Sequence, residues 1–276
     1  MQSGSSNDNR VLGQLIPVRD GPERHALPAG GGVAEVFCAI SPDKPQDNQD
    51  SLMVLQLSDD DVLIAVADGA GGIEGGRRAS RLALSTLRDI VTDKSVSHES
   101  LREAVISGIE HANMAVMSAT RGAATTLTVV CIEGRQARVF HIGDSVALIT
   151  GQRSAVKLQT VAHSPVGFAI AAGFLTEEQA IYHPERHIVS NFVGTNEMVI
   201  EVGAPVTLAK HDTVLLASDG LTDNLHMTEI LQMMRRGAAD QTLDNIVQLA
   251  SERMTRREHH SPGKADDLAV ILFRKP

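Results

Sequence analysis

The chain has 276 residues, 42% of them hydrophobic, so it can bury a substantial core as one large domain or two small ones. Aromatic residues make up only 3% of the chain, and the core must therefore be mainly aliphatic. A net charge of −9 argues against a nucleic-acid or anionic-membrane surface, because such surfaces need clustered Lys and Arg.

The N-terminus has no apolar segment of the signal-peptide kind, and no later apolar run approaches the length of a membrane span. Cys38 and Cys131 each lie inside an apolar run, which is typical of buried, reduced thiols. These features predict a soluble, cytoplasmic protein that contacts neither nucleic acid nor membrane.

Residues 1–31 are rich in Ser, Asn, Gly and Pro, which predicts a poorly ordered N-terminal extension with a short strand at 11–18. Residues 32–276 are predicted to form a single domain. Its first strand, at 33–40, leads into a loop that carries three acids, and a second strand follows at 51–57. Acids in such a loop, Asp50 among them, indicate by themselves only solvated turns.

Strand-like apolar runs meet Asp at three places in the chain. The run 62–67 ends at Asp68, which is followed by five glycines within eight residues, and the run 214–217 leads through Ser218 to Asp219. Near the C-terminus the order is reversed, with Asp266 before the run 268–273. If that strand is antiparallel to the others, the three carboxylates meet at one edge of the sheet. Oxygen-only clusters suit magnesium or manganese, although three unrelated turn caps are the alternative.

Between these motifs the periodicity predicts two helices, at 79–91 and 101–116, the second with a capping box at Ser100-Leu-Arg-Glu103. Strands are predicted at 124–130, 136–141 and 145–149. We expect the last two to pair as a hairpin across Gly143-Asp144, which makes Asp144 a turn-stabilising acid rather than a metal ligand.

Residues 151–200 show little regular alternation apart from a short helix at 176–181. A long irregular segment between two acid-bearing strands is a candidate lid or specificity flap, at about 160–200. Helices at about 228–236 and 242–257 follow. His259-His260 is interpreted as part of an exposed loop rather than as a metal-binding tract.

Six motifs appear in order: DNQDS, VADGAGG, GAATTLTV, HIGDSVALI, LASDGLTD and ADDLAVI. Together they resemble the successive motifs of the type 2C, metal-dependent protein serine/threonine phosphatases. The flap segment, with GFLTEEQA and HPERHIVSN, is similar to the bacterial branch of that family. The resemblance spans residues 33–275.

The resemblance implies an α+β fold: a β-sandwich of two antiparallel sheets flanked by α-helices on both faces, with metals in a cleft at one end. Asp68 would bridge two cations and the carbonyl of Gly69 would bind one of them. Asp219 and Asp266 would complete the shell of the other ion, and Asp50 would hold metal-bound water.

The family's chemistry uses two divalent cations, Mn²⁺ or Mg²⁺. They neutralise a phosphate monoester and lower the pKa of a bridging water, which attacks phosphorus in line without a covalent enzyme intermediate. By resemblance, the substrates are phosphoserine and phosphothreonine in proteins phosphorylated by a Ser/Thr kinase. We expect a monomer.

The chain departs from the family at several positions. Gln49 replaces a Glu, so that metal site should bind its cation more weakly. Lys44, one position out of step, is the nearest substitute for a phosphate-binding Arg, and it cannot form a bidentate fork. Ala70 and Ile73 stand where a His often follows the Asp-Gly turn.

Arg121 stands where the family has an Asp for a third metal, although the usual partner of that Asp is present as Asp223. These departures leave a rival hypothesis: a phosphatase-fold module that binds a phosphoprotein with little turnover. Retention of the four acids, Asp50, Asp68, Asp219 and Asp266, favours the enzyme, since like charges are costly to cluster without a purpose. A small-molecule phosphatase on the same scaffold is a third possibility.

Overall fold

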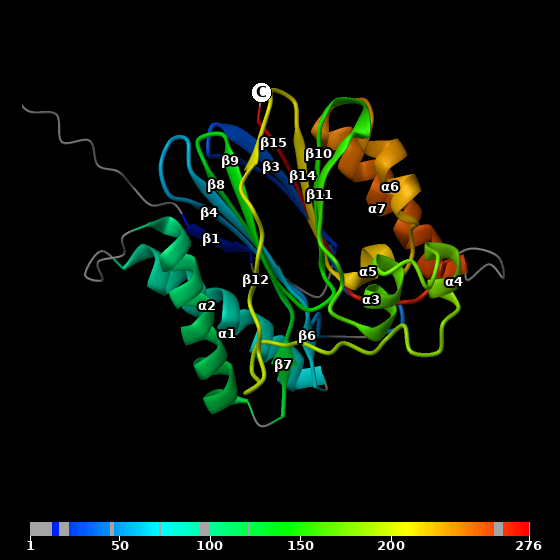
Figure 1. Ribbon diagram of the computed structural model, residues 1–276, viewed down its shortest axis with the longest axis horizontal. Coiled ribbons are helices and arrows are strands. Elements are labelled where there is room, and N and C mark those ends of the chain that lie inside the picture. Colours follow the sequence, from blue (N-terminus) through cyan, green and yellow to red (C-terminus); the bar gives the residue numbers. More distant parts are fainter. Residues whose placement is uncertain are drawn as a thin grey trace, which may run out of the picture.

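The computed structural model describes residues 13–16, 22–44, 47–71, 73–93, 100–120, 122–256 and 262–275. These residues form two large antiparallel sheets packed face to face, with helices on both outer faces (Figure 1). This is the α+β sandwich expected from the resemblance.

The first sheet has seven strands, in the order β1-β4-β5-β8-β9-β12, with β13 also paired to β9. Its strands are β1 (Gly13–Ile16), β4 (Ser51–Gln56), β5 (Val62–Ala67), β8 (Leu127–Glu133), β9 (Gln136–Ile142), β12 (Glu201–Val202) and β13 (Val206–Thr207). The helices α1 (Ile73–Thr92) and α2 (Leu101–Ala119) cover its outer face.

The second sheet has six strands, in the order β11-β10-β14-β15-β3-β2. Its strands are β2 (Glu23–Ala29), β3 (Gly32–Ala39), β10 (Val146–Thr150), β11 (Val156–Gln159), β14 (Thr213–Ala217) and β15 (Leu268–Arg274). Helices α5 (Asp219–Thr222), α6 (Met227–Met234) and α7 (Ala239–Arg256) pack on its outer face. Short elements complete the description: the paired strands β6 (Gly69–Ala70) and β7 (Ala124–Thr125), the flap helices α3 (Pro165–Ala171) and α4 (Glu177–Ile181), and the 3-10 turn η1 (Gln152–Ser154).

Strand alternation distributes side chains between separate cores. In β5, Ile64 and Val66 face the core between the two sheets, whereas Leu63 and Ala65 face α1 and α2. In the same way, β15 sends Ile271 into the central core, and its other face packs on the α5–α7 side. Both faces of these strands are covered, which explains why their sequences are continuous apolar runs.

The prediction that residues 1–31 form a poorly ordered extension is wrong for residues 23–31. Strand β2 pairs along its whole length with β3, and the two are joined by Gly30 and Gly31, with φ of +53° and +68°. Two successive positive φ angles are what a tight two-residue hairpin turn requires, so these glycines form a turn rather than a domain boundary. Strand β1 lies within the strand expected at 11–18.

The other local predictions are mostly confirmed. Ser100 caps α2 by accepting the N–H of Glu103 at 3.3 Å, and α4 starts after Thr176. Cys38 and Cys131 are buried free thiols, and burial raises the pKa of each to about 12. Among the helices described, none is both long and apolar enough to cross a bilayer. His259-His260 and Arg121 lie outside the described residues.

Candidate active site

The acids singled out from the sequence come from the ends of strands in both sheets. Asp50 precedes β4 and Asp68 follows β5 in the seven-stranded sheet. Asp219 follows β14 and Asp266 precedes β15, and these two strands are antiparallel neighbours in the six-stranded sheet. The expectation that three acids share one edge of one sheet is therefore wrong. The antiparallel pairing of β14 and β15 does bring Asp219 and Asp266 to the same edge, but Asp68 comes from the other sheet.

Charges from both sheets nevertheless act on Asp68. Burial raises the pKa of its carboxyl well above the usual range, and the charges of Asp50, Asp219 and Asp266 raise it further. Burial likewise raises the pKa of Asp50, with Asp267, Asp219 and Asp266 adding to the shift. The acids thus form one electrostatic cluster at one end of the sandwich.

The Thr pair of the GAATTLTV motif fixes the backbone of Asp68. The Asp68 N–H donates to Thr126 Oγ1 at 2.9 Å, and its carbonyl accepts from the Thr126 N–H and the Thr125 hydroxyl, both at 2.8 Å. Both threonines are buried. These bonds set the direction in which the Asp68 side chain leaves the strand end.

The next residue, Gly69, lies against Gly76 in the first turns of α1. A Cβ on Gly69 would fall 2.1 Å from the Gly76 carbonyl oxygen, and a Cβ on Gly76 would fall 2.6 Å from that of Gly69. Both positions therefore require glycine, because the two backbones approach more closely than any side chain allows. This packing accounts for two of the five glycines that follow Asp68, Gly69 and Gly76.

A hydroxyl from the opposite sheet orients Asp50. Ser218 donates to Asp50 Oδ2 at 2.7 Å and accepts the N–H of Ala269 at 3.1 Å. All three residues are buried. The serine of the LASDG motif therefore joins the two sheets at the site.

Asp267 is a structural residue that the sequence analysis gave no role. Its carboxylate is 3% exposed and accepts the backbone N–H groups of Ser41 and Gln49, each at 2.8 Å. It also pairs with Lys44, whose Nζ lies 2.8 Å from Oδ2 and 3.3 Å from Gln49 Oε1. The loop before Asp50 is thus anchored to the start of β15. The sequence ADD contains both Asp266 and Asp267, but a role was predicted only for Asp266.

The predicted hairpin across Gly143-Asp144 is wrong. β9 pairs with β8 and β12, whereas β10 pairs with β11 and β14 in the other sheet. The chain crosses between the sheets here, at Gly143, which has a φ of +107° and where a Cβ would fall 2.6 Å from the Thr126 side chain. The crossing places Asp144 in the acid cluster. Burial raises the pKa of its carboxyl to about 8, and the charges of Asp219 and Asp223 also contribute to this shift.

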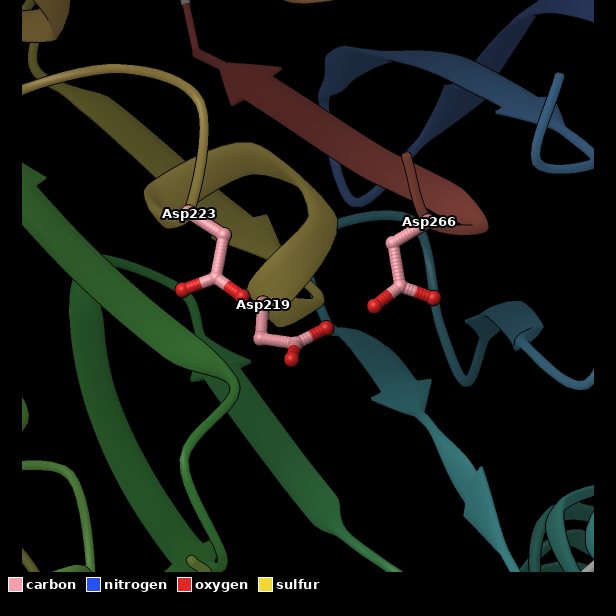
Figure 2. A group of neighbouring side chains, drawn as sticks. All are labelled: Asp219, Asp223 and Asp266. Atoms are coloured by element: carbon pink, nitrogen blue, oxygen red, sulfur yellow. The ribbon is translucent and has the colours of Figure 1, made fainter. Parts of the chain in front are cut away.

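Three carboxylates from the six-stranded sheet lie around a single lysine. Oxygens of Asp219, Asp223 and Asp266 lie within 4.8 Å of one another, the first two at the short helix α5 and the third just before β15 (Figure 2). Lys264 Nζ lies 3.1 Å from Asp219, 2.7 Å from Asp223 and 2.8 Å from Asp266. This lysine is a site residue that the sequence analysis missed.

A cavity of about 320 Å³ opens beside these carboxylates. Asp144, Asp219 and Asp223 line one side of it, and the flap helices supply Ile170 and Ile181. His163 ties the start of the flap to the crossing: its N–H donates to the Gly143 carbonyl at 2.8 Å, and its Nδ1 accepts the Gly143 N–H at 3.2 Å. The segment at 160–200 therefore borders the acid cluster.

Comparison with known proteins identifies the class. The family model described as protein phosphatase 2C matches residues 43–256. The protein phosphatase PhpP of Streptococcus pneumoniae is 32% identical over 219 residues, covering 76% of this chain and 84% of that protein.

Two solved structures are similar to the chain as well. The serine/threonine phosphatase of S. agalactiae gives a TM-score of 0.74 at 26% identity and covers 88% of this chain and 100% of that one. The catalytic domain of the phosphatase PstP, in complex with two manganese ions, gives a TM-score of 0.65 at 22% identity, covering 87% and 96%.

The chain therefore belongs to the protein phosphatase 2C family. Within that family its relatives are bacterial protein serine/threonine phosphatases, and the chain is an enzyme of that kind. This assignment favours the enzyme over the non-catalytic binding module.

Proposed function

We propose that the chain hydrolyses phosphoserine and phosphothreonine in proteins with two divalent cations, Mn²⁺ or Mg²⁺. The observation that carries the proposal is the convergence of Asp50, Asp68, Asp219 and Asp266: burial raises the pKa values of Asp50 and Asp68, and the charges of Asp219 and Asp266 raise both further. Like charges gathered by two sheets at one strand-end site call for cations.

The residues fit such ions. The donor set consists of carboxylate oxygens, with the Gly69 carbonyl added by resemblance to the family, and oxygen-only sets suit hard divalent cations. When bound, the cations supply positive charge for the phosphate and a water of lowered pKa. Asp68, Asp50, Asp219 and Asp266 would hold them.

The protein's own residues set the geometry of this site. Thr125 and Thr126 fix the backbone of Asp68, and Ser218 orients Asp50. Because Ser218 and Asp50 come from different sheets, the sandwich must be assembled before Asp50 is oriented. The acids then act as ligands and not as general bases.

Lys44 is proposed to assist in binding the phosphate. Its ammonium is tied to Asp267 and Gln49, and its side chain remains 28% exposed. An ammonium has three N–H donors, so two contacts leave capacity for a phosphate oxygen. Its pairing with Asp267 also holds the loop that carries Asp50.

The flap is proposed to contact the protein part of the substrate. It borders the cavity beside Asp219 and exposes large apolar side chains, with Phe174 83% and Tyr182 66% exposed. Exposed aromatics beside a polar site are typical of protein-binding surfaces. We further propose that the substrates are products of a Ser/Thr kinase and that the enzyme acts as a monomer.

Hydrolysis of p-nitrophenyl phosphate and of a phosphothreonine peptide, each with Mn²⁺, Mg²⁺ or chelator, tests the proposal. Turnover of both substrates with a divalent cation, and its loss in chelator, is the expected result. Turnover of the aryl ester without the peptide would indicate a small-molecule phosphatase. Undiminished turnover in chelator would refute the two-metal chemistry.

A further inference from the structure

Lys264 occupies a position that would suit a cation. Its ammonium lies within 3.1 Å of three carboxylates, those of Asp219, Asp223 and Asp266, and its three N–H donors match these three acceptors. Figure 2 shows the three acids facing a common space between α5 and the start of β15.

The backbone of Lys264 is clamped to α5. Asn224 accepts the Lys264 N–H at 2.9 Å and donates to its carbonyl at 2.8 Å. Asn224 is fully buried and also donates to the carbonyl of Gly220, the residue after Asp219, at 2.8 Å. One amide therefore fixes the root of the lysine relative to the acids that its ammonium contacts.

We propose that Lys264 is a built-in competitor of the divalent cation. Its ammonium supplies one positive charge to Asp219, Asp223 and Asp266 in the metal-free protein and must withdraw before a cation binds these oxygens. Lys264 thereby sets the cation concentration that the enzyme needs. This inference rests on the proposed two-metal function and adds a residue to it.

The side chain is suited to such withdrawal. It is 31% exposed and has a flexible four-carbon stem, so the ammonium can swing into solvent while the clamped backbone stays in place. An ammonium left beside the carboxylates would repel a bound divalent ion strongly at these short separations. Lysine and metal are therefore alternative occupants.

If Lys264 competes with the cation, removing its charge should have opposite effects on the stability of the metal-free protein and on Mn²⁺ affinity. Lys264→Met removes the charge and keeps most of the stem, so the metal-free protein should lose stability because its carboxylates lose their counter-ion. The same change should strengthen Mn²⁺ binding. If Lys264 were only structural, its substitution would lower stability with and without metal. If it bound phosphate, its substitution would change the KM for substrate and leave the Mn²⁺ affinity unaltered.

The test measures Mn²⁺ binding to the full chain by calorimetry without substrate, together with thermal unfolding in chelator and in Mn²⁺. For Lys264→Met we expect Mn²⁺ to bind about tenfold more tightly, with a lower Tm in chelator only. Lys264→Arg keeps the charge and should bind Mn²⁺ as weakly as the wild type.

Lys157→Met is the matched control, because Lys157 pairs with Asp212, a buried acid outside the cluster. It should lower the Tm in both conditions and leave Mn²⁺ affinity unchanged. Should Lys264→Met not fold, Lys264→Gln offers a second neutral side chain, and crystals of the wild type with Mn²⁺ should show Nζ withdrawn from Asp219.

Tighter binding by Lys264→Met, or binding by this variant alone, supports the proposal. Equal or weaker binding by both neutral variants, or a Mn²⁺-loaded crystal with Nζ still on the three carboxylates, overturns it and leaves the proposed function standing. Absence of Mn²⁺ binding by the wild type and by every variant would overturn both.

Discussion

The two halves of the acid cluster are held in different ways. On the seven-stranded sheet, hydroxyls and backbone groups position Asp50 and Asp68, and these groups carry no net charge. On the six-stranded sheet, the ammonium of Lys264 contacts Asp219, Asp223 and Asp266. Neutral groups alone hold the first half, whereas the second half has one positive charge beside its three carboxylates.

The difference shows that positioning a ligand and neutralising it are separate tasks. Hydrogen bonds from Thr126 and Ser218 place the two acids at the site, yet the pKa values of Asp50 and Asp68 are raised by burial and by neighbouring carboxylates. Under the proposed two-metal function, we expect the Asp50–Asp68 half to depend most on an external cation. The Lys264 half already has a positive charge, which a metal would have to replace.

The largest expected effect follows from removing Asp68. Asp68→Asn should lower kcat/KM by about 10³-fold or more, because a cation's contribution of several kcal/mol depends on this carboxylate. The same variant should unfold at a higher temperature than the wild type in chelator at neutral pH, since burial and neighbouring acids make ionisation of the Asp68 carboxyl costly in the folded state. Aryl phosphate hydrolysis and thermal unfolding measure the two effects.

Asp61→Asn is the matched control, because Asp61 precedes the same strand, β5, at its other end and accepts the N–H of Gly134 at 2.8 Å. It should lower stability slightly and keep activity. Full activity of Asp68→Asn would contradict this comparison of the two halves, because a carboxylate of the half that we expect to depend most on metal would not be needed for activity.

A second expected effect concerns Asp144, which faces the Lys264 half. Its pKa is raised from 3.8 to about 8, so the native state keeps a proton that the unfolded chain loses between these values. The free energy of unfolding of the metal-free protein therefore falls as pH rises from about 4 to 8. Asp144→Asn should raise stability at pH 8 by about 1–3 kcal/mol.

Thermal unfolding in chelator between pH 4 and 8 measures this slope for the wild type, Asp144→Asn and the exposed control Glu110→Gln. The two mutants should differ most at pH 8 and least near pH 4. A loss of stability in Asp144→Asn at pH 8 would restore the turn-stabilising role that its position after Gly143 first indicated.

A smaller effect is expected at the flap, which borders the cavity on the side of Asp219 and Asp223. Replacing Phe174 and Tyr182 together by Ala should reduce kcat/KM for a phosphopeptide by about tenfold, the usual cost of losing an aromatic anchor. Hydrolysis of p-nitrophenyl phosphate should stay within about twofold of the wild type.

Met114→Ala, which removes another exposed apolar side chain, 54% exposed on α2, is the control and should affect neither substrate. An equal loss on both substrates for the flap variant would mean that the segment supports the fold and does not select substrates.

Local sequence signals predicted most elements because strand alternation, capping residues and turn glycines act over a few residues. They failed where a decision depended on distant partners. Gly143-Asp144 has the chemistry of a hairpin turn, and only the pairing of β10 with β14 shows that it is a crossing. Gly30-Gly31 was a different kind of failure, because the signal of a two-residue hairpin turn between β2 and β3 was local but was interpreted as a boundary.

The candidate site followed the same rule. The strand-end positions of Asp68, Asp219 and Asp266 were predictable because each lies at or next to the end of an apolar run. Lys264 and Asp267 could not be assigned, since their roles depend on contacts with distant residues, 41 positions away for Lys264 with Asp223 and 226 for Asp267 with Ser41. The ADD sequence places Asp267 beside the candidate ligand Asp266, but it does not identify Ser41 or Gln49 as the partners of Asp267.

The smallest expected effect tests Gln49, which stands beside the charge-deficient half. Its amide oxygen accepts from Lys44 at 3.3 Å, and its backbone N–H donates to Asp267 at 2.8 Å. Gln49→Glu would add a carboxylate at this place and should lower the Mn²⁺ concentration for half-maximal rate by about threefold, because ligand charge tunes affinity for hard cations.

The gain should be small because Lys44 is close enough to neutralise part of the new charge. Combining Gln49→Glu with Lys44→Met should therefore increase the shift in Mn²⁺ requirement, whereas Lys44→Met by itself should mainly raise the KM for phosphate esters. Measuring the rate against Mn²⁺ concentration for the two single variants and the double variant separates these effects. If the Mn²⁺ concentration for half-maximal rate is unchanged in both proteins that carry Gln49→Glu, residue 49 lies outside the metal site. The expected dependence of this half on an external cation would then rest on Asp50 and Asp68 alone.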